Sequence, residues 1–219
     1  MIDINEIKEF ISTRIKAVEN KSINENLEND NGLLLHFVPE TLIEEKINKP
    51  IDWANSDHQF IIKHGFRKFS DLQTAYVDQT DRIEGYTPNS EFFNCFQNGI
   101  IEVYKSKVEI ENQLGSEFNY VKVDNLFYAI RNFLEVSRVL HKKIYKTEPP
   151  YLIFISVLGI TGTYFYSFDG RFQTTTPFPS KNLRFEPFNL LDLEQPIIKE
   201  IAAGINQGIR TAAQWNWKK

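Results

Sequence analysis

Apolar residues recur every three or four positions in three stretches of the chain, which is the period of an amphipathic helix. The first stretch covers residues 3–18. The second covers residues 124–146, with Asp124 placed as its N-terminal cap. The third covers residues 192–215, with Pro196 in its first turn. We therefore predict a short N-terminal helix, a long middle helix and a long C-terminal helix.

Continuous apolar runs and short alternating runs predict strands between these helices. Residues 33–38 are apolar up to Pro39 and are typical of a buried strand, and residues 151–158 fit a central strand covered on both faces. Short runs between residues 58 and 107 predict an antiparallel meander with a hairpin turn at Asn98-Gly99. Further strands are expected at residues 162–168, as a hairpin partner of 151–158, and at residues 182–188.

The order of these elements predicts an α+β fold, in which an antiparallel or mixed sheet is flanked by helices, with an N-terminal helical arm and a long C-terminal helix. Residues 1–19 hold the first helix. Residues 20–32 break every period with Asn, Asp, Glu and Gly, and we interpret them as a linker. Residues 33–219 then form a single α+β domain.

Composition excludes several classes of protein. The chain has 219 residues, of which 42% are hydrophobic and 25% charged, so it is neither disordered nor a collagen or disulfide scaffold. Cys95 is the single cysteine, no apolar run approaches the length of a membrane span, and the start lacks a signal-peptide pattern. We expect a cytoplasmic, reduced protein without membrane contact. The formal net charge of −4 argues against holding a polyanion by bulk electrostatics.

Motifs for catalysis, metals and cofactors are scarce, and we predict no cofactor, no metal and no catalytic residue. Neither metal-ligand spacing, nor a phosphate loop, nor a nucleophile elbow is present. His36, inside an apolar run, is interpreted as a hydrogen-bonded core residue, and His141 as a favourable contact with a helix dipole. His58 and His64 with Asp57 support the weakest alternative, a hydrolase.

Two sets of residues are candidates for binding. The first is a ligand pocket at the sheet edge, in which tyrosine stacking and an arginine on phosphate would suit a small ligand or a nucleotide. Its residues are Tyr164, Tyr166, Arg171 and Arg184. The second is an interface for a protein partner, formed by a hairpin, a proline-punctuated loop and the C-terminus. Its residues are Asn98, Phe172, Phe178, Lys181, Trp215 and Trp217.

Small residues form a stripe along the predicted C-terminal helix. Gly204, Gly208 and Ala212 recur every four residues and would let another backbone approach closely. A glycine inside a helix costs about 1 kcal/mol relative to alanine, so we expect a packing reason for the two glycines. We favour a tight internal helix contact, and a homodimer through this stripe is the alternative.

Several segments together resemble a known family. They are the helix with Phe10 and Arg14-Ile15, Leu35-His36-Phe37-Val38-Pro39, Gly65-Phe66-Arg67 with Phe69 and Asp71, Phe96-Gln97-Asn98-Gly99-Ile100-Ile101-Glu102, Pro149-Pro150 before residues 151–159, and a closing helix with Trp215. From residue 5 onward the chain resembles the C-terminal region of bacterial Alba-like, Schlafen-related DNA-binding-domain (ATP-binding) proteins, here without that N-terminal domain. The most specific segment is FQNGIIE, which is similar to FRNGIIE in the family, with Gln97 where arginine is usual.

The resemblance implies an accessory region rather than the domain that handles nucleic acid or nucleotide, so neither ATP binding nor DNA binding is transferred. Our first hypothesis is a non-catalytic interaction module that works with a Schlafen-like nucleic-acid-handling partner in anti-phage defence. It would contact nucleic acid only indirectly, through that protein partner. A small-ligand or nucleotide sensor is the alternative.

Overall fold

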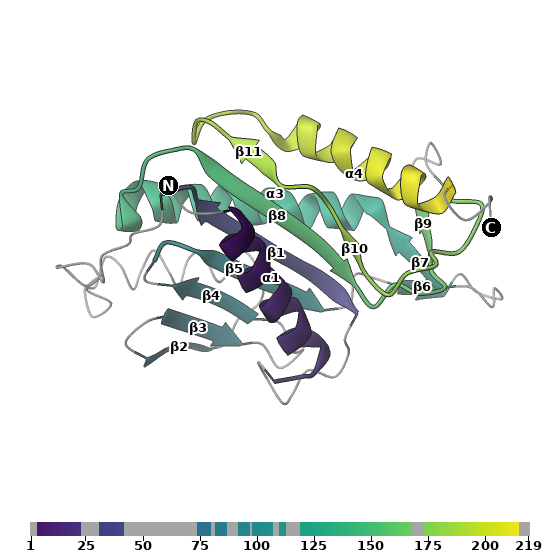
Figure 1. Ribbon diagram of the computed structural model, residues 1–219, viewed down its shortest axis with the longest axis horizontal. Coiled ribbons are helices and arrows are strands. Elements are labelled where there is room, and N and C mark those ends of the chain that lie inside the picture. Colours follow the sequence, from purple (N-terminus) through teal and green to yellow (C-terminus); the bar gives the residue numbers. More distant parts are fainter. Residues whose placement is uncertain are drawn as a thin grey trace.

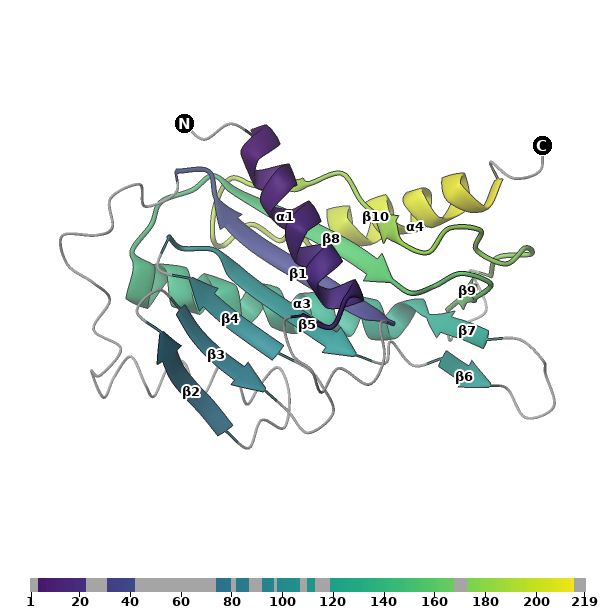
Figure 2. The same cartoon turned by 60° about the horizontal axis from the view of Figure 1, so that its bottom comes forward.

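A twisted antiparallel sheet with helices on both faces forms the body of the protein (Figures 1 and 2). The computed structural model describes residues 4–22, 31–41, 74–79, 82–86, 92–96, 98–106, 110–112, 119–167 and 173–214. Helix α1 (Ile4–Glu19) covers one face, while α3 (Val123–Leu140) and α4 (Ile198–Gln214) cover the other. The predicted α+β class is confirmed. No helix in the described residues is long and apolar enough to cross a membrane.

The main sheet has eight strands in the described part of the chain, in the order β10-β8-β1-β5-β4-β3-β2, with β11 also paired to β8. Their bounds are β1 Gly32–Pro39, β2 Thr74–Gln79, β3 Arg82–Tyr86, β4 Phe92–Phe96, β5 Ile101–Ser106, β8 Tyr151–Leu158, β10 Leu183–Arg184 and β11 Phe188–Leu190. Strands β2 to β5 form the predicted antiparallel meander. Gly99, in the turn between β4 and β5, has a φ of 90°, which glycine adopts without strain.

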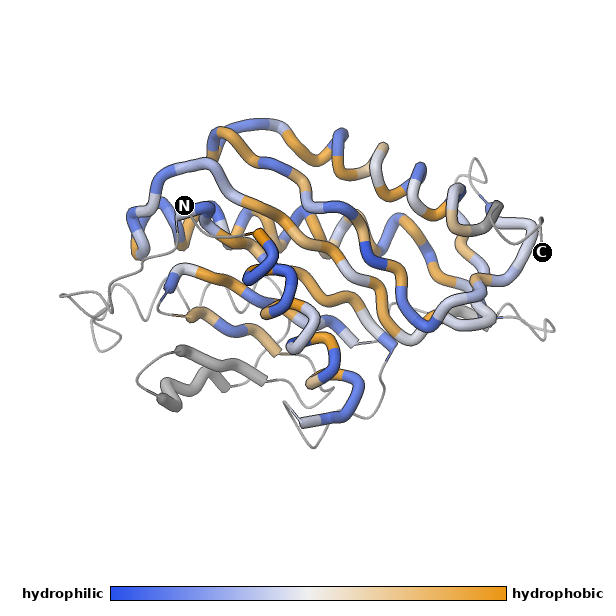
Figure 3. The backbone as a smooth tube through the Cα atoms, viewed as in Figure 1, coloured by the Kyte–Doolittle hydropathy of each residue, from blue (hydrophilic) through white to orange (hydrophobic). Residues whose placement is uncertain are grey.

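The central strands β1 and β8 separate two hydrophobic clusters. Every residue of both strands is buried, as the continuous apolar runs predict, and successive side chains point to opposite faces. Leu35 and Ile153 belong to the larger cluster, under α3 and α4. Leu34 and Phe154 belong to the smaller cluster, under α1. The hydropathy of the chain follows this arrangement, because both strands are apolar along most of their length (Figure 3).

Helix α1 packs on the sheet through one apolar stripe. The buried residues of this stripe are Ile7, Ile11, Ile15 and Val18, at the three-and-four spacing that the sequence predicts. They meet side chains of β1, β4, β5 and β8 in the smaller cluster. Most of the predicted linker, residues 23–30, lies outside the described part of the chain, and the domain division stays a prediction.

A second sheet of three strands lies beside the main one. It consists of β6 (Ile110–Asn112), β7 (Asn119–Lys122) and β9 (Tyr164–Tyr166), and β7 and β9 run parallel. The prediction that residues 162–168 pair with 151–158 is therefore wrong. The chain that leaves β8 bonds instead to Phe178, whose carbonyl accepts from the Gly162 N–H and whose N–H donates to the Thr163 carbonyl.

The middle helix is shorter than predicted and changes its winding. Lys122 is the N-cap and makes no side-chain cap bond, so the prediction of Asp124 as cap is wrong, and Asp124 lies in the first turn. The helix ends at Leu140, and a π-helix, η1 (His141–Tyr145), follows it. Lys146 then adopts a left-handed conformation with a φ of 52°, which ends the helical segment.

The C-terminal elements also differ from the prediction at their boundaries. α4 begins at Ile198 rather than near residue 192, because side chains bond the preceding backbone into a turn: Asp192 Oδ1 accepts from the Glu194 N–H at 2.9 Å. The expected strand at residues 182–188 is divided into β10 and β11. Pro187 lies between the two strands and has no N–H to donate to a ladder.

Candidate functional site

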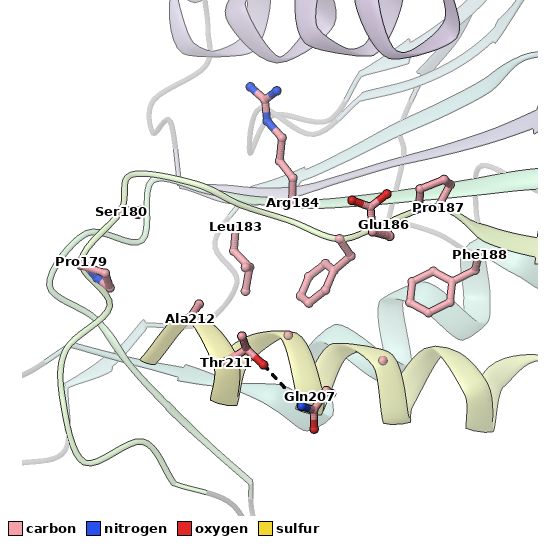
Figure 4. Close-up of a pocket in the computed structure, with 13 residues that line it drawn as sticks. Pro179, Ser180, Leu183, Arg184, Glu186, Pro187, Phe188, Gln207, Thr211 and Ala212 are labelled. Atoms are coloured by element: carbon pink, nitrogen blue, oxygen red, sulfur yellow. Dashed lines mark hydrogen bonds between the residues drawn. The ribbon is translucent and has the colours of Figure 1, made fainter. Parts of the chain in front are cut away.

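A groove of about 700 Å³ runs between α4 and the strand segment 179–188 (Figure 4). Phe188 points from the strand segment toward the helix (Figure 4), and the Phe185 ring lies next to Gly208. These two rings form one wall, and Leu183 extends this apolar surface. The helix presents small residues as the floor. The rim is polar, and its residues include Glu186, Gln207 and Thr211.

The two glycines of α4 shape this groove. A Cβ atom on Gly204 would lie 2.6 Å from Phe188 Cε1, and a Cβ atom on Gly208 would lie 2.8 Å from Phe185 Cε1. The helix therefore accommodates both phenyl rings only because these positions lack side chains. The small-residue stripe therefore makes the internal contact that we favoured, but its partners are two phenyl rings and not a second helix. A homodimer through Gly204, Gly208 and Ala212 would require both rings to move.

The predicted ligand residues lie on different elements. Arg184, on β10, points away from the groove toward α1, and its Nη1 lies 3.4 Å from Ser12 Oγ (Figure 4). Tyr164 and Tyr166 lie on β9 in the three-stranded sheet. Arg171 lies outside the described residues. The structure thus does not bring Arg184 and the two tyrosines into one pocket.

The predicted interface residues also lie in separate places. Asn98 is half-buried, and its Oδ1 accepts from the Ile100 N–H at 3.1 Å, so its side chain stabilises the hairpin turn. Lys181 is exposed and lies 3.3 Å from Glu19 Oε1. Its carbonyl accepts from Ile160, just beyond β8. The end of β8 pairs with Gly32, and Gly32 pairs with the last residue of β5. The Asn98 turn comes before the first residue of β5, so Asn98 and Lys181 lie at opposite ends of the sheet.

Phe178 is a core residue rather than an exposed anchor. It is 3% exposed, and its ring meets that of Phe165 edge-on at a centroid distance of 5.7 Å. The prediction of Phe178 as an interface residue depended on an exposed ring and is wrong in that respect, because the proline-rich loop turns the ring inward onto β9. Phe172, Trp215 and Trp217 lie outside the described part of the chain.

A buried polar cluster, which the sequence did not predict as a unit, joins α1 to the sheet. Its centre is the fully buried carboxylate of Glu102. Arg14 donates to both carboxylate oxygens, from Nε to Oε2 at 2.8 Å and from Nη2 to Oε1 at 2.6 Å. Asn94 Nδ2 donates to Oε1 at 2.7 Å, and His36 Nε2 lies 3.0 Å from Oε2. The carboxylate is therefore held by one helix and by both strands that flank β5.

The electrostatics of this cluster favour the ionised carboxylate. Burial alone would raise the pKa of Glu102, but the hydrogen bonds from Arg14 and His36, together with the charge of Arg14, outweigh burial and lower that pKa to about 2. Phe96 lies beneath the Arg14 guanidinium, 5.7 Å from the ring centroid to Cζ. Glu102 is thus a fixed anion that holds α1, and His36 is confirmed as a hydrogen-bonded core residue.

The sequence does carry one signal for this cluster. His36 and Asn94 are each the single polar side chain of an otherwise apolar strand, and Glu102 is a fully buried charge on the strand between them. The sheet register pairs His36 with Glu102 and Asn94 with Glu102. Polar residues that interrupt three neighbouring buried strands must satisfy one another, because an unpaired buried polar group is costly.

His141 lies at the end of α3 in an aromatic environment. The ring is fully buried and stacks on Phe37 at 4.8 Å, and its Nδ1 lies 2.6 Å from Thr147 Oγ1. Burial lowers the pKa of His141 to about 3, so the imidazole is neutral and the predicted charged contact with a helix dipole is wrong. Cys95 is buried, as predicted, and burial raises the pKa of its thiol.

The residues of the hydrolase alternative, Asp57, His58 and His64, lie outside the described part of the chain. Among the residues that are described, no group of three His, Cys, Asp or Glu side chains is placed to hold a metal ion. No protein-family model, no curated protein and no solved structure matches this chain. The likeness to Schlafen-related proteins therefore stays a prediction.

Proposed function

We propose that this chain is a non-catalytic interaction module, and that the groove between α4 and the segment 179–188 receives an apolar segment of a protein partner. The observation that carries the proposal is the composition of the groove. Phe185 and Phe188, whose rings pack on the two glycines of α4, give the groove an apolar lining, and polar residues surround it. An apolar centre with a polar rim is the usual anatomy of a protein interface, and a volume of about 700 Å³ accepts a few large side chains.

The rim indicates the chemistry of the partner segment. The Glu186 side chain is 93% exposed. Its Oε2 lies 3.9 Å from Lys8 Nζ, which is at the outer limit of an ion pair. A basic residue next to apolar anchors would therefore complement this rim. Lys181 adjoins the groove residue Ser180, and predicted anchor Trp215 follows the groove residue Ala212 by three positions. Two of the three predicted contact segments are thus next to groove residues in the sequence.

The sequence resemblance supports a choice of partner. We propose a Schlafen-like protein that handles nucleic acid, with a role in anti-phage defence. We place the module in the cytoplasm, since its single cysteine is a buried free thiol rather than part of a disulfide.

The experiment captures partners from the native host with the tagged full chain and with two tryptophan variants of α4. Ala212→Trp fills the groove, because Ala212 lines it and points into it (Figure 4). Ala203→Trp is the matched control, since Ala203 is exposed on the same helix and does not line the groove. We expect a Schlafen-related protein to be retained by the wild type and by Ala203→Trp, and to be lost with Ala212→Trp.

Purified partner then replaces the lysate, and calorimetry measures its dissociation constant with each chain. Thermal melting of the three chains establishes that Ala212→Trp is folded. Equal retention of every protein by Ala212→Trp and by wild type would refute the groove as the contact surface. A selectively lost partner without a Schlafen-related domain would refute the choice of partner but leave the groove supported.

A further inference from the structure

Three tyrosines and one lysine share a face of the small three-stranded sheet. Tyr120 and Lys122 on β7 lie in register with Tyr164 and Tyr166 on β9. Val121 and Phe165, which alternate with them, are fully buried in the main core. The four polar-tipped residues therefore occupy the opposite, outward face, where each is half-buried.

The ring of Tyr120 contacts both other rings of this tyrosine face. Tyr120 lies 5.6 Å from Tyr164, with 36° between the ring planes, and 5.8 Å from Tyr166, edge-on at 89°. Two residues on one strand are about 6.6 Å apart along the strand. That distance is about twice the 3.4 Å rise of stacked bases, so neighbouring rings suit bases spread along an extended strand rather than bases stacked on one another.

Lys122 gives the tyrosine face its positive end. It lies in register with Tyr166, whereas β6 places Glu111 in register with Tyr120 at the other end. A phosphate would approach the ammonium of Lys122 while a base lies on a tyrosine ring. The net charge of −4 means that stacking, and not bulk attraction, must supply most of the affinity.

We infer that the tyrosine face, formed by Tyr120, Lys122, Tyr164 and Tyr166, binds single-stranded nucleic acid by stacking its bases. This inference does not depend on the groove between α4 and the segment 179–188. It replaces the expectation that nucleic acid is contacted only through a partner. It also reassigns Tyr164 and Tyr166 from the predicted pocket with Arg184 to a site with Tyr120.

The test is fluorescence anisotropy of a labelled twelve-nucleotide oligothymidine with the full chain, up to about 100 μM protein at 50 mM salt. Loss of one stacking ring costs about 5- to 150-fold in affinity. We expect that loss for Tyr166→Leu, which keeps apolar volume, and close to wild-type affinity for Tyr166→Phe, which keeps the ring. Lys122→Gln should reduce the slope of log affinity against log salt by about 0.7, the value for one phosphate contact on a single strand.

Tyr128→Leu is the matched control, because Tyr128 is an exposed tyrosine on α3, 66% exposed, outside the tyrosine face. Its affinity should equal that of the wild type. Three results would overturn the inference: no binding by the wild type, equal loss in Tyr128→Leu and Tyr166→Leu, or equal affinity for a duplex of the same length. Because the first result uses only the wild-type chain, a variant that fails to fold does not obstruct the test.

Discussion

Arg14→Met tests the buried ion pair that holds α1 on the sheet. The substitution keeps most of the aliphatic volume of the side chain but removes both hydrogen bonds to Glu102. Removing one partner of a buried pair typically costs about 3–5 kcal/mol, because the other charge stays buried without compensation. The pKa of Glu102 gives a similar magnitude, since a fall from 4.5 to about 2 corresponds to about 3 kcal/mol of favourable interaction with the ionised form. We expect a loss of about 3 kcal/mol at pH 7.

The dependence on pH has opposite signs in the wild type and in this variant. In the wild type the folded pKa of Glu102 is lowered, so its contribution is present above about 4.5 and is lost as the pH falls toward 2. In Arg14→Met, the hydrogen bonds and the charge of Arg14 no longer counteract burial. Burial therefore raises the pKa of Glu102 above its value in the unfolded chain. At this carboxyl the folded variant then binds more protons than the unfolded chain, so the contribution of Glu102 to stability increases as the pH falls from 7 to 5, whereas the effect of His141 is common to both proteins. The difference between the two proteins should therefore be smaller at pH 5 than at pH 7.

Urea unfolding at pH 7 and at pH 5 measures both effects. Lys16→Met is the matched control, because Lys16 is exposed on the same helix, and it should change stability by less than about 0.5 kcal/mol. The double variant Arg14→Met with Glu102→Gln should recover part of the loss, since it leaves no unpaired charge. A loss below about 1 kcal/mol at pH 7, or an equal loss at both pH values, would show that the pair does not hold α1.

Two further predictions concern the packing of α4 and the end of α3. Gly208→Ala should destabilise the protein despite a gain of about 1 kcal/mol in helix propensity, because its Cβ would lie 2.8 Å from the Phe185 ring. In a Phe185→Ala background, Gly208→Ala should instead stabilise the protein. Urea unfolding of the wild type, both single variants and the double variant shows whether the two changes are coupled or additive. The pKa of His141 is lowered to about 3, so the wild type loses up to about 1.4 kcal/mol per pH unit below about 6.5, where only the unfolded chain is protonated. His141→Phe should remove this slope between pH 6.5 and 5, and an unchanged slope in urea midpoints would contradict the burial of a neutral ring.

The sequence predicts those elements whose pattern is local. The buried runs of β1 and β8 and the spacing of α1 are each decided by residues within the element, and they match the prediction. The partner of β9 depends instead on Phe178 bonding to the chain that leaves β8, which no local pattern contains. Strands β6 and β7 are short and polar, so neither gives a recognisable period.

The burial of Phe178 could not be predicted for a related reason, because exposure is a property of the tertiary fold. Phe178 lies in a polar, proline-rich loop, where an aromatic residue suggests an exposed anchor, yet its ring is buried against Phe165. Tyr164 and Tyr166 share a face of β9, since alternate residues of a strand point to the same side. Their companion Tyr120 is distant in the sequence and is brought beside them by the parallel pairing of β7 and β9.

The segments that carry the family resemblance converge on the cluster under α1. Arg14, His36 and Glu102 come from three of those segments, and they contact one another through a single carboxylate. Phe10 and Phe96, from the same segments, meet edge-on at 5.7 Å beside this cluster. These residues are needed to hold α1 on the sheet, whatever the protein binds. These contacts bear on the fold more than on activity, whereas the tyrosine face uses residues outside these segments and must be tested by binding.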